Sequence, residues 1–212
     1  MWNMSNSFAN KVARFGNSTT SLKIYLLHLL WRRLVTRIYY RPLFRSIGRR
    51  SVIYRNDMLV NSEYMSIGDN VSIRFGSRLE VVLHGQDWEP RLSIGHNVNV
   101  EQCAHIVCHD QVLIEDNVSI APFCTILDTS FSPAAGLEGR KIGSTVKQER
   151  SSVHIGMNTL IGAGVTILPN VRIGRNCVVG AGSVVTGDIP EASVAAGVPA
   201  RVIRHLVLAV PT

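Results

Sequence analysis

Three histidines, His84, His105 and His109, lie in one stretch of the chain that also contains Asp110 and precedes Asp128. A neutral imidazole is the usual side chain for taking a proton from a hydroxyl group near pH 7. Histidines are also common zinc ligands, but an irregular set such as this one is weak evidence for a metal. The stretch therefore indicates acid–base chemistry or a metal site, depending on the elements that position it.

The cysteines indicate neither a disulfide framework nor a zinc finger, because Cys103, Cys108, Cys124 and Cys177 form no C-x-x-C pair. We expect packed free thiols, which favours a reducing compartment. The apolar run over residues 24–31 is too short to span a bilayer and is followed by two arginines instead of a cleavage site. These features predict a cytoplasmic protein.

A six-residue repeat runs from Val153 to Pro190. Its first position is aliphatic, and its fourth position is always Asn, Gly or Asp, at Asn158, Gly164, Asn170, Asn176, Gly182 and Asp188. This period fits neither a helix nor simple alternation and is typical of a β-solenoid. The fourth-position residues tolerate a left-handed backbone and so predict corners, whereas the β-branched first positions predict inward-facing strands.

Upstream of this run the same aliphatic spacing continues in units of three blocks, which predicts about five coils starting near Met65. Every extra residue falls at the same corner of the predicted prism. The three excursions span residues 82–91, 110–113 and 128–152. Long loops on a rigid scaffold are where function usually resides, so this corner is the candidate site.

The segment from Ala195 to Arg204, Ala-Ala-Gly-Val-Pro-Ala-Arg-Val-Ile-Arg, resembles the closing motif of serine, maltose, nodulation and polysaccharide O-acetyltransferases. Together with the repeat, it makes residues 65 to 205 similar to the hexapeptide-repeat acyltransferases. The resemblance implies an all-β solenoid, a left-handed parallel β-helix, that assembles as a homotrimer and uses acetyl-CoA as acyl donor. The expected divisions are a basic N-terminal helical extension (1–56), the β-helix (57–190) with an active-site loop (128–152), and a closing segment (191–212).

Acyl transfer to a hydroxyl needs a base and donors for the tetrahedral oxyanion. Relatives carry their base histidine in the long loop, where this chain reads Asp128-Thr-Ser-Phe-Ser. Stacking places His109 one rung, about 4.8 Å, below this position. His109 is therefore the first candidate base, His84 the second, and Asp128 a further catalytic candidate. Alternatively, His109 is only a corner residue with left-handed backbone, whereas His105 should point outward from a strand.

For acetyl-CoA, the resemblance implies that the pantetheine arm follows the later coils. Ala163, Ala181 and Thr186 would line its groove, and Arg201 and Arg204 would meet the nucleotide phosphates, a task that suits guanidinium groups. The two alanines could equally be small residues that a tight coil requires. Related solenoids with carbonic anhydrase activity bind zinc through three histidines, but the spacing here matches them poorly, so no metal is expected.

The basic residues are unevenly placed, because residues 1–56 hold eleven of the 22 Lys and Arg and no Asp or Glu. Residues 21–41 have helical spacing of apolar positions, and Pro42 should end the helix. A basic amphipathic helix could lie on an anionic membrane surface, or it could cap the first coil. No nucleic-acid recognition module is evident, so nucleic acid is not an expected partner.

We therefore expect a cytoplasmic O-acetyltransferase, peripheral at the inner membrane face if its helix binds lipid, that modifies a sugar hydroxyl in cell-surface polysaccharide biosynthesis. One alternative is a small-molecule acetyltransferase acting on an amino acid, an antibiotic or a nucleotide-sugar. Another is a β-helix that has lost catalysis and serves as a scaffold or binding subunit, which the missing loop histidine favours.

Overall fold

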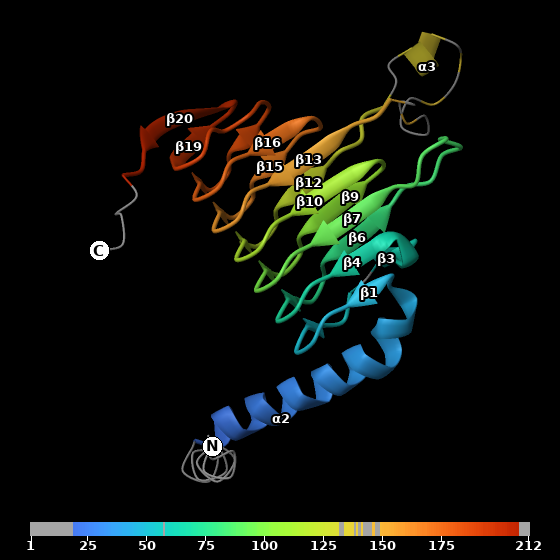
Figure 1. Ribbon diagram of the computed structural model, residues 1–212, viewed down its shortest axis with the longest axis vertical. Coiled ribbons are helices and arrows are strands. Elements are labelled where there is room, and N and C mark those ends of the chain that lie inside the picture. Colours follow the sequence, from blue (N-terminus) through green and yellow to red (C-terminus); the bar gives the residue numbers. More distant parts are fainter. Residues whose placement is uncertain are drawn as a thin grey trace, which may run out of the picture.

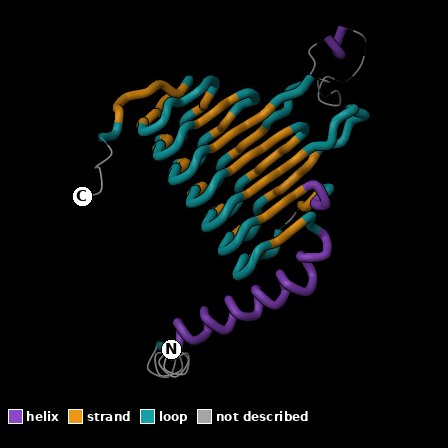
Figure 2. The backbone as a smooth tube through the Cα atoms, viewed as in Figure 1, coloured by secondary structure: helices purple, strands orange, loops and turns teal. Residues whose placement is uncertain are grey.

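The computed structural model describes residues 19–56, 58–131, 134–137, 139, 141, 146 and 149–207. Short strands stack into a three-sided prism, a left-handed parallel β-helix, as the repeat and the resemblance predicted (Figures 1 and 2). Residues 1–18, the last five residues and much of the expected active-site loop lie outside the described residues.

Each side of the prism is one sheet, in which neighbouring strands of successive coils are parallel. Sheet A contains β1 (Ser46–Ile47), β4 (Met65–Ile67), β7 (Arg91–Ile94), β10 (Gln111–Ile114), β13 (Ser152–Ile155) and β16 (Val171–Ile173). Sheet B contains β2 (Val52–Ile53), β5 (Ser72–Ile73), β8 (Asn99–Val100), β11 (Ser119–Ile120), β14 (Leu160–Ile161), β17 (Val178–Val179), β19 (Ser193–Gly197) and β20 (Ala200–His205). Sheet C contains β3 (Met58–Val60), β6 (Arg78–Val81), β9 (His105–Cys108), β12 (Thr125–Leu127), β15 (Thr166–Ile167) and β18 (Val184–Val185).

The solenoid starts one coil earlier than the expected start near Met65. Strand β1 already pairs with β4 in parallel, and β2 pairs with β5, so both belong to the prism although they precede the expected boundary at residue 57. This first coil follows the six-residue spacing through Ile47, Ile53 and Leu59. Its left-handed corner residue is Arg50 (φ 61°), an unusual choice that hid the coil from the sequence pattern.

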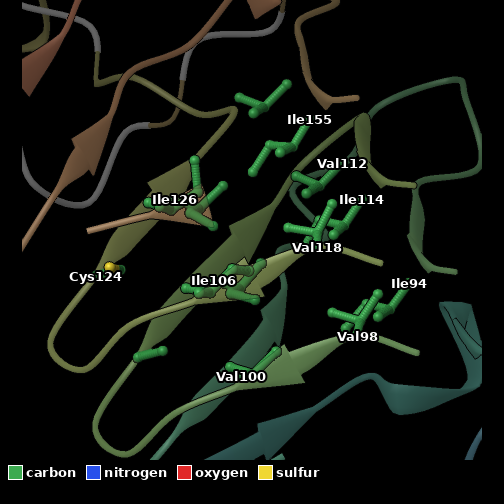
Figure 3. Packing of buried hydrophobic residues seen from close by; sticks show 14 of the residues in the cluster. Ile94, Val98, Val100, Ile106, Val112, Ile114, Val118, Cys124, Ile126 and Ile155 are labelled. Atoms are coloured by element: carbon green, nitrogen blue, oxygen red, sulfur yellow. The ribbon is translucent and has the colours of Figure 1, made fainter. Parts of the chain in front are cut away.

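The inward positions form one continuous column of apolar side chains, part of which is shown in Figure 3. Ile106 and Ile126 stack in register on sheet C, as Ile94 and Ile114 do on sheet A. All four are almost fully buried. Cys124 and Cys177 are likewise buried and free, as predicted. Because each buried aliphatic side chain contributes about 1.5–3 kcal/mol, this column supplies most of the driving force for the fold.

The corner between sheets A and B carries a ladder of asparagines, all with φ near +57°. Each side-chain amide donates to the amide oxygen of the next asparagine at 2.9–3.2 Å, through Asn70, Asn97, Asn117, Asn158 and Asn176. Asparagine suits this position twice, because it tolerates the left-handed backbone and can both donate and accept. Of the six predicted corners in the C-terminal repeat, only Asp188 lacks a positive φ.

Excursions from the prism occur where the chain passes from sheet C to sheet A, as the spacing predicted. We call residues 82–90, 109–110 and 128–151 of these passages the insertion corner. Figure 1 shows the loop after β6 and the loop containing α3 (Ala134–Leu137) on the same side of the stack. The first coil uses the same corner for a short 3₁₀-helix, Ser62–Tyr64.

The N-terminal helix α2 (Thr20–Val35) runs away from the first coil, and none of its residues is buried (Figure 1). A π-helical turn (Thr36–Tyr40) and a 3₁₀ turn (Arg41–Leu43) follow, so the α-helix ends earlier than predicted, and Pro42 lies inside the 3₁₀ turn. Thr36 and Tyr40 are buried against the first coil, with the Ile53 amide donating to the Thr36 hydroxyl at 2.9 Å. The C-terminal half of α2 also faces the first coil, because the Arg32 guanidinium lies 5.9 Å and the His28 ring 6.1 Å from the Tyr54 ring. The cap hypothesis therefore leaves the N-terminal half of α2 and its exposed side unexplained.

Candidate active site

The insertion corner brings His109 and Asp128 into adjacent coils, because β12 pairs with β9 in the predicted register. Asp128 is fully buried, and its two carboxylate oxygens accept the backbone N–H groups of His109 at 2.6 Å and Asp110 at 2.9 Å. Burial raises the pKa of Asp128, although these hydrogen bonds oppose the increase. The carboxylate thus fixes the backbone of the corner, which makes Asp128 a positioning residue for His109.

His109 does not have the left-handed backbone expected of a corner residue, so that expectation was wrong. Its side chain turns inward and is only 1% exposed. The ring Nδ1 lies 3.2 Å from the Val82 carbonyl oxygen, which can only accept, so Nδ1 carries the proton. In the neutral ring Nε2 therefore holds the lone pair, and it is buried without a hydrogen-bond partner. This is the tautomer that a general base needs.

Trp88, on the first excursion, covers His109. The indole N–H donates to the His109 carbonyl oxygen at 3.1 Å, and the two rings meet edge to face with centroids 5.3 Å apart. On its other side the Trp88 ring faces the Arg150 guanidinium at 5.8 Å. Arg150 in turn makes a two-pronged salt bridge to the buried Asp110, at 3.0 and 3.2 Å. These contacts of Trp88, Asp110 and Arg150 connect the three excursions to one another.

Sequence reasoning missed Trp88 and Arg150, since neither belongs to the repeat and no spacing connects them. A weak signal was available, because both lie on excursions of the same predicted corner. Cys108 is also buried at this centre. Burial, and then the nearby Asp128 carboxylate, raise the pKa of the Cys108 thiol far above its ordinary value, so it stays protonated at neutral pH.

The other histidine candidates lie apart from this buried centre. His84 is exposed on the first excursion, where its backbone N–H donates to the Gln86 side chain at 2.6 Å. His105 lies on the outer face of sheet C, as predicted, with Nε2 3.6 Å from a Glu80 oxygen. Among the described residues, no group of three His, Cys, Asp or Glu side chains could hold a metal ion.

A second charged cluster lies on the outer face of sheet A, around a cavity of about 440 Å³. The His154 Nε2 is 2.7 Å from a Glu115 oxygen, and the other oxygen accepts the Met157 N–H at 3.0 Å. Burial acts to raise the pKa of Glu115, but these hydrogen bonds and the charge of His154 outweigh it and leave the pKa lowered. The His154 side chain is half-buried and held in place by this hydrogen bond to Glu115.

The residues predicted to hold acetyl-CoA are all exposed or nearly so, but they do not share one corner. Ala163 and Ala181 stack at the corner between sheets B and C, where the Gly182 N–H donates to the Ala163 carbonyl at 2.8 Å. Thr186 follows β18 where the chain passes from sheet C to sheet A, above the three excursions that make up the insertion corner. Arg201 and Arg204 project from β20, which pairs antiparallel with β19. The residues predicted for the donor therefore lie at separate places on one chain.

The fold and the six-residue repeat agree with the comparisons to known proteins. The family model described as bacterial transferase hexapeptide (six repeats) matches residues 152–187. A lipopolysaccharide biosynthesis O-acetyl transferase of Escherichia coli K12, WbbJ, is 35% identical over 81% of this chain and 83% of its own length. The galactoside O-acetyltransferase of the same organism is 36% identical over 74% of this chain and 71% of its own length.

Among solved structures, a mutant of the N-acyltransferase AntD from Bacillus cereus, in complex with dTDP and coenzyme A, has a TM-score of 0.56 and 20% identity. The alignment covers 79% of this chain and 88% of AntD, which supports the β-helix fold.

Within the described residues, no helix is both long and apolar enough to cross a membrane.

Proposed function

Because this chain belongs to the hexapeptide-repeat acyltransferases, we propose that it acetylates a sugar hydroxyl during cell-surface polysaccharide biosynthesis, with acetyl-CoA as donor. The observation that carries the chemistry is the His109 ring, with Nδ1 held by a carbonyl and a lone pair left on Nε2. The acceptor class is supported by the two relatives whose names specify lipopolysaccharide and galactoside acetylation.

In this proposal acetyl-CoA supplies an activated acetyl thioester, which the acceptor hydroxyl attacks. His109 Nε2 takes the hydroxyl proton as the new C–O bond forms, and it returns the proton to the departing sulfur as the C–S bond breaks. The Val82 carbonyl holds the ring orientation throughout, and the Asp128 carboxylate holds the His109 backbone. Trp88 covers the ring, so this proposal requires its side chain to move aside for the acceptor hydroxyl to reach Nε2.

The residues predicted for the donor fit a long, phosphorylated ligand. The exposed methyl groups of Ala163 and Ala181 leave room beside the B–C corner for a thin chain such as pantetheine. Arg201 and Arg204 are exposed, and the Arg201 Nη1 hydrogen bond found here goes to the neighbouring Ala200 carbonyl at 2.9 Å. Guanidinium groups so placed can bind phosphate oxygens.

The separation of the donor residues onto two corners is the reason to propose a homotrimer. In a three-fold assembly, the B–C corner of one chain can face the insertion corner of the next, which would unite Ala181 with the partner's Thr186 and His109. Sedimentation equilibrium should then give a mass three times the 23.4 kDa of the chain at micromolar concentration. A stable monomer that still acetylates acceptors would contradict this arrangement.

A thiol-release assay tests the proposed reaction. The chain is incubated with acetyl-CoA and, separately, with galactosides, surface-glycan fragments, serine and an aminoglycoside. We expect CoA release above the hydrolysis background only with sugar acceptors, together with an added acetyl ester detected by mass spectrometry.

The rival function is a non-catalytic scaffold, which the absence of a histidine between His109 and His154 favours. It predicts no release with any acceptor while a glycan still binds.

A further inference from the structure

The free face of α2 carries an apolar stripe that the solenoid does not use. Its members, spaced by three and four residues, are each between 48% and 68% exposed, at Ile24, Leu27, Trp31 and Leu34 of α2 and at Ile38 of the π-helical turn that continues it. Helical spacing places them on one side, opposite the buried Thr36 and Tyr40 that dock on the first coil. A contiguous exposed apolar surface of this kind usually marks an interaction site.

A cationic pocket of about 550 Å³ lies at the base of this helix, between the π-helical turn and the first corner of the solenoid. Five arginines line it, at Arg33, Arg37, Arg41, Arg49 and Arg50. Its described lining residues include no carboxylate, although the nearby Asp69 carboxylate accepts the backbone N–H of Arg49 at 2.6 Å. The Arg33 Nε is buried without a hydrogen-bond partner. None of the salt bridges among the described residues involves these arginines.

We propose that this pocket binds the phosphate groups of anionic phospholipids while the stripe of α2 inserts at the membrane surface. Guanidinium groups pair with phosphate oxygens in a planar, two-pronged geometry, so five of them without a carboxylate form a site for a multiply charged phosphate surface. The pocket extends from the docked side of this helical element, where Thr36 lines it, to the exposed Arg37, which follows Leu34 of the stripe by three residues. Such a helix lies in the interface with its basic residues towards the headgroups.

A second copy of this chain is the other occupant that a three–four stripe suggests, since coiled coils use the same spacing. The charges oppose it. Residues 1–56 contain no Asp or Glu, so two or three copies of α2 would bring only positive charges together, without the flanking salt bridges that stabilise such a seam. An anionic lipid surface removes this repulsion, and the inference does not depend on the proposed reaction.

Vesicle co-sedimentation of the full chain tests the site, using phosphatidylcholine alone and phosphatidylcholine with about 30% phosphatidylglycerol. We expect the wild type to prefer the anionic vesicles by at least about tenfold, and the Arg37→Gln/Arg41→Gln/Arg50→Gln variant to lose roughly 100-fold in partitioning. The matched control, Arg55→Gln/Arg78→Gln/Arg172→Gln, removes the same charge from exposed positions outside the pocket and should lose less than about fivefold. Circular dichroism of each variant verifies folding.

The stripe is tested separately with Leu27→Ser/Trp31→Ser, which should abolish vesicle binding while leaving the sedimentation mass in solution unchanged. Three results would overturn the proposal. Equal losses in the pocket and control variants would mean diffuse charge instead of a site. Binding of inorganic pyrophosphate by the wild type without binding of anionic vesicles would identify a soluble phosphate ligand. A stripe variant that changes the mass in solution would make a second copy of the chain the occupant.

Discussion

Exchange of His109 for asparagine should lower turnover in the thiol-release assay by about 10²–10⁴-fold, the range typical of losing a general base. The asparagine amide can still donate to the Val82 carbonyl from nearly the position of Nδ1, so the corner should keep its shape. What disappears is Nε2, the buried atom with a free lone pair. Binding of CoA and the sedimentation mass should remain those of the wild type.

His105 provides the matched control, because it is a histidine of the same coil on the outer face of sheet C. His105→Asn should keep turnover within about threefold of the wild type, since it removes no group from the proposed centre. Full activity in His109→Asn would show that the histidine only fills the corner, and the exposed His84 would then be exchanged next. Equal losses in both variants would indicate a general structural effect.

Exchange of Asp128 for alanine should lower the free energy of unfolding by about 2–6 kcal/mol, because it leaves two buried backbone N–H groups without an acceptor at about 1–3 kcal/mol each. Asp128→Asn should cost about 1–3 kcal/mol, since one oxygen remains while the new amide meets a donor. Urea denaturation measures both. Asp116→Ala is the control, because Asp116 also accepts a backbone N–H, from His96 at 2.7 Å, but at an exposed corner where water can replace it.

The same residue gives a signed pH dependence. Burial raises the pKa of Asp128 in the folded chain, so the folded state binds its proton more tightly than the unfolded state does. The stability from this group is fully present below the unfolded pKa and is lost as the pH rises through the folded pKa. The difference in unfolding free energy between wild type and Asp128→Asn should therefore widen from pH 7 to about pH 4. A constant difference would mean that the Asp128 pKa is not raised.

The sequence was sufficient for the fold because each requirement of a coil is local. Each coil needs an aliphatic residue that points inward at every sixth position and a residue that accepts a positive φ at the fourth position of a block. A single residue, usually Ile or Asn, meets each requirement, and the same requirement returns in every coil. The first coil was missed where this local rule is broken. Arg50 takes the left-handed corner that asparagine takes above it, and a run of arginines there looked like part of a helical extension.

The site was predictable only in part, for a physical reason. The rung that relates His109 to the long loop follows from the strand register and could be counted. The contacts of Trp88 and Arg150 depend on loops without a repeat, so no spacing predicts them. The buried position of the His109 side chain also could not be predicted, because it depends on the hydrogen bond from the His109 backbone N–H to the Asp128 carboxylate. The repeat therefore fixes where the site lies, and the loops determine its chemistry.

A parallel β-helix can in principle grow without limit along its axis, since its last rung offers unpaired backbone groups to any further rung. Strand β20 reverses direction and hydrogen-bonds to β19 antiparallel, so the final edge of sheet B is already taken (Figure 1). Its outer residues include the exposed Arg201, Arg204 and His205, which a second solenoid end would have to desolvate. Because charged, reversed edges are a common defence against end-to-end association, the closing motif disfavours the addition of a further rung to sheet B.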